Sequence, residues 1–288
     1  MSNCTVSSSQ RVLACVLLSI VTLCVGRSSR ALELTDQVKI NEVSYDPNEV
    51  VNGSEEPYEY IELYNAGSTT AYLDGAAISD EGGNGTSEAT FVFPGGHGGT
   101  SIPLAPGAFL LLVVDATGSP WGGGSGGNGL ARFEFYAGGT DSDEPTTPNL
   151  IKTAGMGLDL SFANAGDGVT LSTGVSTGSV IPCAEIVDGV SWETGGTGDT
   201  TPLSNTVCTD PSPHPGYTNG GASLNQTLQR NNDGIDTNTS SSADFQAAVR
   251  SPGAPNTRTN TVGIYADSTA SLGGALCAPI GTRIRCTS

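Results

Sequence analysis

Three glutamates stand in the stretch of the chain with the densest apolar and aromatic pattern. Glu42 lies in Ile-Asn-Glu-Val, and Glu59 and Glu62 lie in Tyr-Glu-Tyr-Ile-Glu-Leu-Tyr. Carboxylates that gather in one place can bind a hard cation. The competing interpretation is structural, because a buried Glu without a partner costs several kcal/mol and a basic residue such as Arg230 could pair with Glu62. Basic residues are few, and we favour a structural polar cluster of Glu42, Glu59, Glu62 and Arg230.

A second acidic pattern runs from residue 231 to residue 238, Asn-Asn-Asp-Gly-Ile-Asp-Thr-Asn. Its oxygen-bearing side chains loosely resemble those of a calcium loop, with Asp233, Asp236 and Asn238 as candidate ligands. The pattern lacks the twelve-residue frame and the closing Glu of an EF-hand, so a polar turn is favoured. The acidic run Asp141–Glu144 is typical of a solvated loop. We therefore expect no cofactor, with calcium as the one candidate.

Residues for nucleophilic catalysis are scarce. The two histidines, His97 and His214, lie among Gly and Pro residues, which indicates exposed loops rather than bases held by a second group. The sequence contains no Gly-x-Ser-x-Gly, and Gly122–Gly129 lacks the Lys and Ser or Thr of a phosphate-binding loop. Trp192 lies in a strand-like run, where core packing is its default role. The sequence predicts no catalytic residues and a protein that is not an enzyme.

The N-terminal part has the pattern of a secretory signal peptide. Arg11 precedes a nearly unbroken apolar run, Val12–Val25, and small residues follow. The run is shorter than the ~20 residues that span a bilayer, so we expect a signal peptide over residues 1–31, cleaved after Gly26 or Ala31. The alternative is a lipoprotein in which Cys24 carries the lipid. No other run could span a bilayer, which predicts a secreted or cell-surface protein with no membrane span after cleavage.

The formal net charge of −18 limits the partners. Three of the 11 Lys and Arg residues precede residue 31, and without them 8 basic residues stand against 29 acidic ones, a net charge of −21. So acidic a surface repels the phosphates of nucleic acids and anionic membranes. We expect an extracellular protein or glycan partner and no nucleic acid.

The cysteines fit an oxidising compartment. Three of the seven lie in or before the signal-like run, and the even number that remains predicts two disulfides in an exported chain. Four cysteines allow three pairings. We favour the pairing that closes the shortest loops, Cys183 with Cys208 and Cys277 with Cys286. The absence of a Cys-x-x-Cys pair argues against a structural zinc site.

The elements that must position these residues are strands. The 40 Gly and 16 Pro residues break helices, and short apolar or alternating runs recur between them. Val43 breaks the alternation begun at Val38 and Ile40, which indicates a β-bulge near Asn41 and Glu42. We expect strands at 37–43, 58–65, 72–79, 90–93, 109–115, 133–136, 158–162, 169–172, 186–192 and 223–230.

Two of these runs carry a further expectation. The run 109–115 is apolar throughout and is expected to be buried on both faces. The runs 158–162 and 169–172 are joined by Asn-Ala-Gly-Asp-Gly, which predicts a hairpin. No alternation of strands with helices is visible, so the fold class is all-β, and a two-sheet antiparallel sandwich fits best.

Ten short sequences occur in an order that resembles a lamin tail domain of the bacterial, secreted kind. They are Ile40–Val43, Tyr60–Asn65, Leu73–Gly75, Leu104–Gly107, Gly168–Leu171, Asp188–Trp192, Ser223–Leu224, Gln229–Arg230, Asp244–Phe245 and Ser251–Asn256. The resemblance runs from about Val38 to Asn256 and implies an immunoglobulin-like antiparallel β-sandwich. This sequence adds long Gly-rich loop insertions at Gly122–Asp143 and Thr194–Gly221. The chain would then comprise the signal peptide 1–31, the sandwich domain 36–256 and a C-terminal extension 257–288 with its own Cys pair.

The resemblance also bears on function. Lamin tail domains are usually non-catalytic interaction modules, found in nuclear lamins and in exported bacterial proteins, sometimes beside nucleases or other hydrolases. The favoured function is therefore a non-catalytic exported binding or structural module, outside the cell or at its surface. The alternative is a secreted hydrolase, or a protein accessory to one, that acts on extracellular polymers with calcium as an aid.

Overall fold

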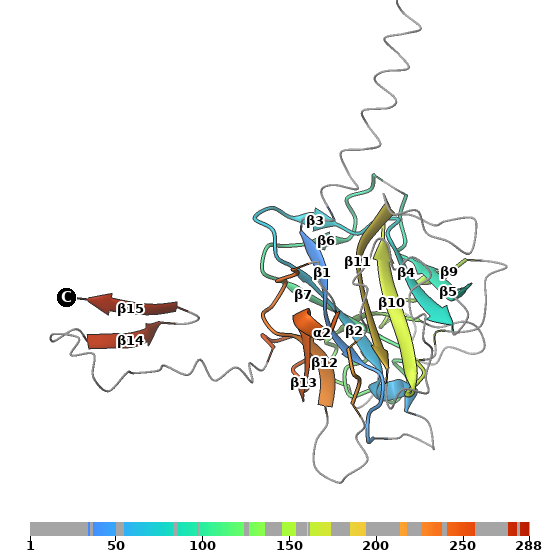
Figure 1. The fold of residues 1–288 in the computed structure, drawn as a ribbon. Coiled ribbons are helices and arrows are strands. Elements are labelled where there is room, and N and C mark those ends of the chain that lie inside the picture. Colours follow the sequence, from blue (N-terminus) through green and yellow to red (C-terminus); the bar gives the residue numbers. More distant parts are fainter. Residues whose placement is uncertain are drawn as a thin grey trace, which may run out of the picture. The chain divides into compact units, whose positions relative to one another are not determined.

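The computed structural model divides the chain into two compact units, Met1–Thr257 and Arg258–Ser288. It describes residues 34, 37–49, 55–82, 86–96, 98–123, 127–135, 146–153, 160, 162–173, 185–193, 214–217, 226–237, 241–256, 276–280 and 283–287. Nearly all of the regular structure in these residues is β-strand. Figure 1 shows the strands of the first unit gathered into one sandwich.

The larger sheet of the first unit has six strands. It contains β1 (Val38–Ser44), β2 (Tyr60–Asn65), β7 (Phe109–Val113), β8 (Ala131–Glu134), β12 (Gln226–Arg230) and β13 (Phe245–Val249). Their order is β13-β12-β1-β2-β7-β8. Every neighbouring pair is antiparallel except β7 and β8, which run parallel. Because β1 lies between β2 and β12, the sheet joins the first and last strands of the unit.

The smaller sheet has five strands, all antiparallel to their neighbours. It contains β4 (Ala77–Gly82), β5 (Thr86–Val92), β9 (Ile151–Lys152), β10 (Gly166–Ser172) and β11 (Ile186–Glu193), in the order β11-β10-β4-β5-β9. A short ribbon pairs β3 (Ala71–Tyr72) with β6 (Pro103–Leu104). Two short helical turns, η1 (Glu56–Tyr58) and α2 (Ser241–Asp244), complete the described elements of this unit.

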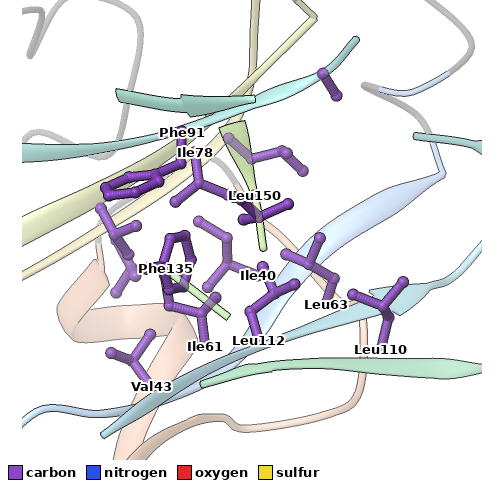
Figure 2. Close-up of a cluster of buried hydrophobic side chains, with 14 of the residues drawn as sticks. Ile40, Val43, Ile61, Leu63, Ile78, Phe91, Leu110, Leu112, Phe135 and Leu150 are labelled. Atoms are coloured by element: carbon purple, nitrogen blue, oxygen red, sulfur yellow. The ribbon is translucent and has the colours of Figure 1, made fainter. Parts of the chain in front are cut away.

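The hydrophobic core fills the space between the two sheets. Side chains alternate along a strand, so Ile61 and Leu63 of β2 point into the core while Tyr60 packs on the outer face. Each fully buried aliphatic or aromatic side chain of this size contributes ~1.5–3 kcal/mol. Figure 2 shows part of this core, contributed by both sheets and their loops: Ile40, Val43, Ile61, Leu63, Ile78, Phe91, Leu110, Leu112, Phe135 and Leu150.

Three expectations about the strands are confirmed. The register between β1 and β2 shifts between Ile40 and Glu42, so the bulge lies where the alternation breaks. Strand β7 is buried on both faces, with Leu112 in the core and Leu111 in the outer cluster around Trp121. Trp192 is fully buried and its ring stacks on that of Tyr45, with centroids 4.4 Å apart.

Two expectations about the strands are wrong. The run 72–79 is not one strand, because the chain turns at Gly75, where φ is 72°. Both carboxylate oxygens of the preceding Asp74 hold this turn, accepting the N–H groups of Ser101 (3.0 Å) and Ile102 (2.9 Å). Strand β10 is already paired along both edges, with β11 and with β4, so residues 169–172 are not available for the predicted hairpin with 158–162, a run of which the structure describes only residues 160 and 162.

The second unit contains the hairpin of β14 (Leu276–Ile280) and β15 (Arg283–Thr287). Its antiparallel register sets Cys277 directly opposite Cys286. The predicted bond between these two cysteines stays a prediction.

Candidate functional site: carboxyl groups beneath residues 250–256

Residues 250–256 follow β13 and pass over acidic side chains of the larger sheet and of the turn after β12, and we call this segment the strap. Three of its backbone N–H groups each donate to a different acidic side chain: Ser251 to Glu42 (3.0 Å), Gly253 to Glu62 (2.6 Å) and Asn256 to Asp233 (2.9 Å). The acidic residues that the sequence singled out therefore hold the chain's own backbone. Such a hydrogen bond is worth about 0.5–1.5 kcal/mol when its acceptor is neutral and about 1.5–3 kcal/mol when its acceptor is charged.

Glu42 is fully buried and directly opposite Glu62 in the register of β1 and β2. Its carboxylate accepts the hydroxyl of Tyr60, the hydroxyl of Thr227 (2.6 Å) and the hydroxyl of Ser251 (3.1 Å). Burial raises the pKa of Glu42, and the hydrogen bonds from these residues oppose the rise. Several donors around one carboxylate stabilise its charge without a neighbouring cation.

Glu62 is fully buried as well, but it has fewer donors. The side-chain amide of Asn41 donates to its Oε1 (3.1 Å) and the strap N–H of Gly253 to its Oε2 (2.6 Å). Burial, and then the charge of Glu42, raise the pKa of Glu62 to about 9. Two carboxyl groups that face each other in a dry environment cannot both ionise without a large cost, so Glu62 keeps its proton at neutral pH.

Arg230 is fully buried but pairs with Asp188, so the expected pair of Glu62 with Arg230 is wrong. Its guanidinium donates to both carboxylate oxygens of Asp188, at 2.9 Å and 2.7 Å, and to the carbonyl oxygens of Ile40 (2.7 Å) and Ile235 (3.0 Å). Asp188 also accepts the N–H of Ile40 (2.7 Å). Because β11 and β12 belong to different sheets, this ion pair joins the two layers of the sandwich.

The four residues of the predicted polar cluster are all buried, although they do not form one cluster. Glu42 and Glu62 lie beneath the strap, and Arg230 belongs to the ion pair with Asp188. Glu59 lies just before β2, where its carbonyl accepts the N–H of Val114 (3.0 Å). Asp188 was not among the predicted site residues, and its only local signal is an acidic residue in the middle of the mostly buried strand β11.

The candidate calcium ligands already have partners within the protein. Asp233 Oδ1 accepts the side-chain amide of Asn41 (3.2 Å) as well as the strap N–H of Asn256. Asp236 pairs with Lys39 (2.8 Å), with Arg230 3.8 Å away. Asn238 lies outside the described residues. Within the described ranges, no group of three or more His, Cys, Asp and Glu side chains is placed to hold a metal ion.

His214 is buried, contrary to the expectation of an exposed loop histidine. Residue 214 forms a parallel bridge with Trp192, and its backbone exchanges hydrogen bonds with Ser191 and Glu193 at 2.9 Å each. The side chain is only 9% exposed, and its Nδ1 accepts the N–H of Gly216 (3.1 Å). Burial lowers the pKa of His214 to about 4, so the imidazole is neutral at pH 7. The flanking Pro residues favoured the prediction of an exposed loop, because Pro is uncommon in the middle of a sheet.

Several other predictions fall on residues that the structure does not describe. They are the signal peptide, His97, the acidic run Asp141–Glu144, Cys183 and Cys208. In the part of the chain that is described, no helix has the length and apolar character needed to cross a membrane.

The fold and the buried carboxyl groups define an immunoglobulin-like β-sandwich whose polar interior fastens its own backbone. The model of the Lamin Tail Domain matches residues 33–205, more than half of the chain, and the chain belongs to that family. Strands β12 and β13 and the strap lie beyond the matched residues, yet they complete the sheet that contains β1.

One solved structure supports the same fold. The crystal structure of a DUF4876 family protein from Bacteroides thetaiotaomicron resembles this chain with a TM-score of 0.54 and 15% sequence identity. The similarity covers 78% of this chain and 73% of that one. At this identity the similarity shows the fold alone. No curated protein matches the sequence.

Proposed function

We propose that this chain is a non-catalytic binding or structural module that works outside the cell or at its surface. The supporting observation is that the acidic and basic side chains of the candidate site are bonded to other groups of the same domain. Glu42, Glu62, Asp188 and Arg230 are buried and bonded to the domain itself. Groups that hold a fold together are not free to act on a substrate, so recognition is left to the surface and the loops. The family, whose known members are usually interaction modules, agrees with this proposal.

Export is supported by the apolar run Val12–Val25 and by the even cysteine count that follows it. The test is expression of the full chain in a host that exports proteins, beside the variant Leu18→Arg, which interrupts the run. We expect the unaltered chain outside the cytoplasm with an N-terminus between residues 27 and 32, and the variant retained inside. An unaltered chain that stays uncleaved in the cytoplasm would overturn export.

The non-catalytic proposal is tested with the purified chain from residue 32 onward. Screened against nucleic acid, ester and glycan substrates, with and without calcium, it is expected to show no turnover. Saturable binding to an extracellular protein or glycan, without binding to duplex DNA at physiological salt, is the expected positive result. Metal-dependent turnover of any of these substrates would replace the proposal with the secreted-hydrolase alternative.

Calcium is tested separately, because Asp233 and Asp236 would have to exchange internal partners for the ion. In a calorimetric titration of the same chain we expect no heat of binding and no shift in melting temperature. A saturable heat would contradict this expectation, and its loss in Asp236→Asn would assign the ion to the turn.

A further inference from the structure

The strap covers a pair of carboxyl groups that face each other across two strands. Glu42 and Glu62 are direct partners in the β1–β2 register, both without solvent exposure. The strap touches each of them through a backbone N–H, that of Ser251 and that of Gly253. These two N–H donors favour the ionised form of each carboxyl group, whereas burial, the larger cause, disfavours it.

The other ionisable groups around the pair act in opposite directions, because the hydroxyl of Tyr60 favours the ionised form of Glu42 and the charge of Asp233 disfavours that of Glu62. Tyr60, on β2, donates its hydroxyl to Glu42, and Asp233, in the turn after β12, adds a further carboxylate near Glu62. From β12 the partner of Glu42 is the neutral Thr227. On β7 the residue opposite Glu62 is Leu111. The strap's own Arg250 lies 5.3 Å from the ring centroid of Trp121 and pairs with Glu49 (2.7 Å).

We propose that the strap is a proton-controlled latch, which stays closed while the Glu42–Glu62 pair holds a proton and opens more readily as that proton is lost. The strap is suited to separate movement. Between Gly253 and Pro255 it is exposed to solvent, and it belongs to no strand. A segment with few buried apolar contacts and no ladder of backbone hydrogen bonds opens at a lower free energy than the whole domain.

The sign of the pH dependence follows from linkage. In the closed state, burial is the main cause that raises the pKa of Glu62 to about 9 from its ordinary value of 4.5. Opening lets water reach the carboxyl group, whose pKa then returns towards the ordinary value. Between those two values the closed state holds a proton that the open state does not, so each unit of rising pH lowers the closed-to-open ratio by up to tenfold. The latch is tightest in acid and weakens through neutral pH.

The test is amide hydrogen exchange of the chain from residue 32 to residue 288 between pH 5 and pH 9. Protection factors remove the base catalysis of exchange itself, so they report opening alone. We expect the protection factors of Ser251, Gly253 and Asn256 to fall at least tenfold from pH 6 to pH 9. In Glu62→Gln, which keeps an acceptor oxygen but cannot ionise, we expect a fall of less than twofold. Unchanged protection at Val190 of β11 would show that the opening is local.

A second measurement keeps the proposal testable if Glu62→Gln does not fold. In the unaltered protein, the amide shift of Gly253 reports the ionisation of Glu62, to which that N–H donates. We expect its pH midpoint far above 4.5. A midpoint near 4.5 would overturn the latch, because Glu62 would then be ionised beneath a closed strap. A high midpoint with constant strap protection would overturn it too, because ionisation would then occur without opening.

Discussion

At the scale of single residues, the buried charge of Arg230 depends on its ion pair with Asp188. The guanidinium is fully buried, and its nearest anionic partner, Asp188, lies in the opposite sheet. Removing one member of a buried ion pair leaves an uncompensated charge, whose desolvation is no longer offset by attraction. The loss of either partner should therefore destabilise the folded protein strongly.

The variant Asp188→Asn is expected to lower the free energy of unfolding by ~3–5 kcal/mol, because the buried Arg230 loses its closest counter-charge and keeps only the more distant Asp236, 3.8 Å away. The measurement is urea unfolding at pH 7. Arg132→Gln, on the exposed side of β8, is the matched control and should change stability by less than ~0.5 kcal/mol. A loss below 1 kcal/mol in Asp188→Asn would mean that water or another acid compensates Arg230.

His214 adds a pH effect of the opposite sign to that of Glu62. Its pKa is lowered to about 4 in the folded state, against an ordinary 6.5, so the unfolded chain takes up a proton first as the pH falls. Its contribution to stability is present above about 6.5 and is lost between that pH and about 4. In His214→Asn, whose side-chain oxygen can accept the N–H of Gly216, this loss should disappear.

The comparison for His214 is the change in unfolding free energy from pH 7 to pH 5. We expect the unaltered protein to lose more stability over that interval than His214→Asn does. Because Glu62 is present in both proteins, its contribution cancels in the difference. Identical pH profiles would contradict this expectation, because the imidazole would then take up its proton at the same pH in the folded and the unfolded protein.

At the scale of elements, the turn 231–237 brings several groups to the end of β12. It carries Asp233 to the strap and Asp236 to Lys39, and its N–H at Gly234 donates to Asn41 Oδ1 (3.1 Å). Gly234 has φ of 65°, a conformation that costs little only for glycine. A Cβ at this position would lie 2.5 Å from the Cβ of Ala66. The turn therefore tolerates no side chain at its tightest point.

Gly234→Ala is expected to destabilise the domain more than Gly129→Ala does. Both positions have the left-handed conformation, with φ of 65° and 70°, but a Cβ at Gly129 meets nothing within 4 Å. The backbone cost is thus shared, and the difference isolates the clash, which we expect to be ~1–3 kcal/mol by thermal or urea unfolding. Equal losses in the two variants would mean that the turn shifts freely away from Ala66.

At the scale of the molecule, the boundary at Thr257 separates a sandwich from a hairpin. The strap belongs to the first unit, and its N–H groups donate to Glu42 and Glu62 of the larger sheet. Its asparagine side chain adds two further bonds, from Asn256 Nδ2 to the carbonyl oxygens of Asn41 (3.1 Å) and Arg230 (3.0 Å). The sandwich is complete only when the chain reaches Asn256.

Two truncated chains test this boundary. A chain of residues 32–257 should melt within ~2 °C of the chain of residues 32–288, because the second unit is a separate compact body. A chain of residues 32–249, which lacks the strap, should lose ~3 kcal/mol or more, because several buried hydrogen bonds disappear. Equal stability of the two shorter chains would show that the strap contributes nothing to the fold.

The sequence by itself determined several of the longer strands, such as β1, β2, β7 and β11, together with the sandwich class and the position of the bulge. These features depend on the alternation of side chains along one strand, as at Val38 to Val43, and on the helix-breaking Gly and Pro content. The continuous apolar run of β7 was enough to predict its burial on both faces. All of these are properties of neighbouring residues.

Only the tertiary structure decided which partner each buried polar group has. The partner of Arg230 is Asp188, 42 residues away in the other sheet, and not Glu62, which instead lies beneath Gly253. The burial of His214 and the turn at Gly75 were also hidden. A periodic pattern predicts which face of a strand a side chain occupies. The packing of the two sheets and the path of the strap determine which residue that side chain contacts.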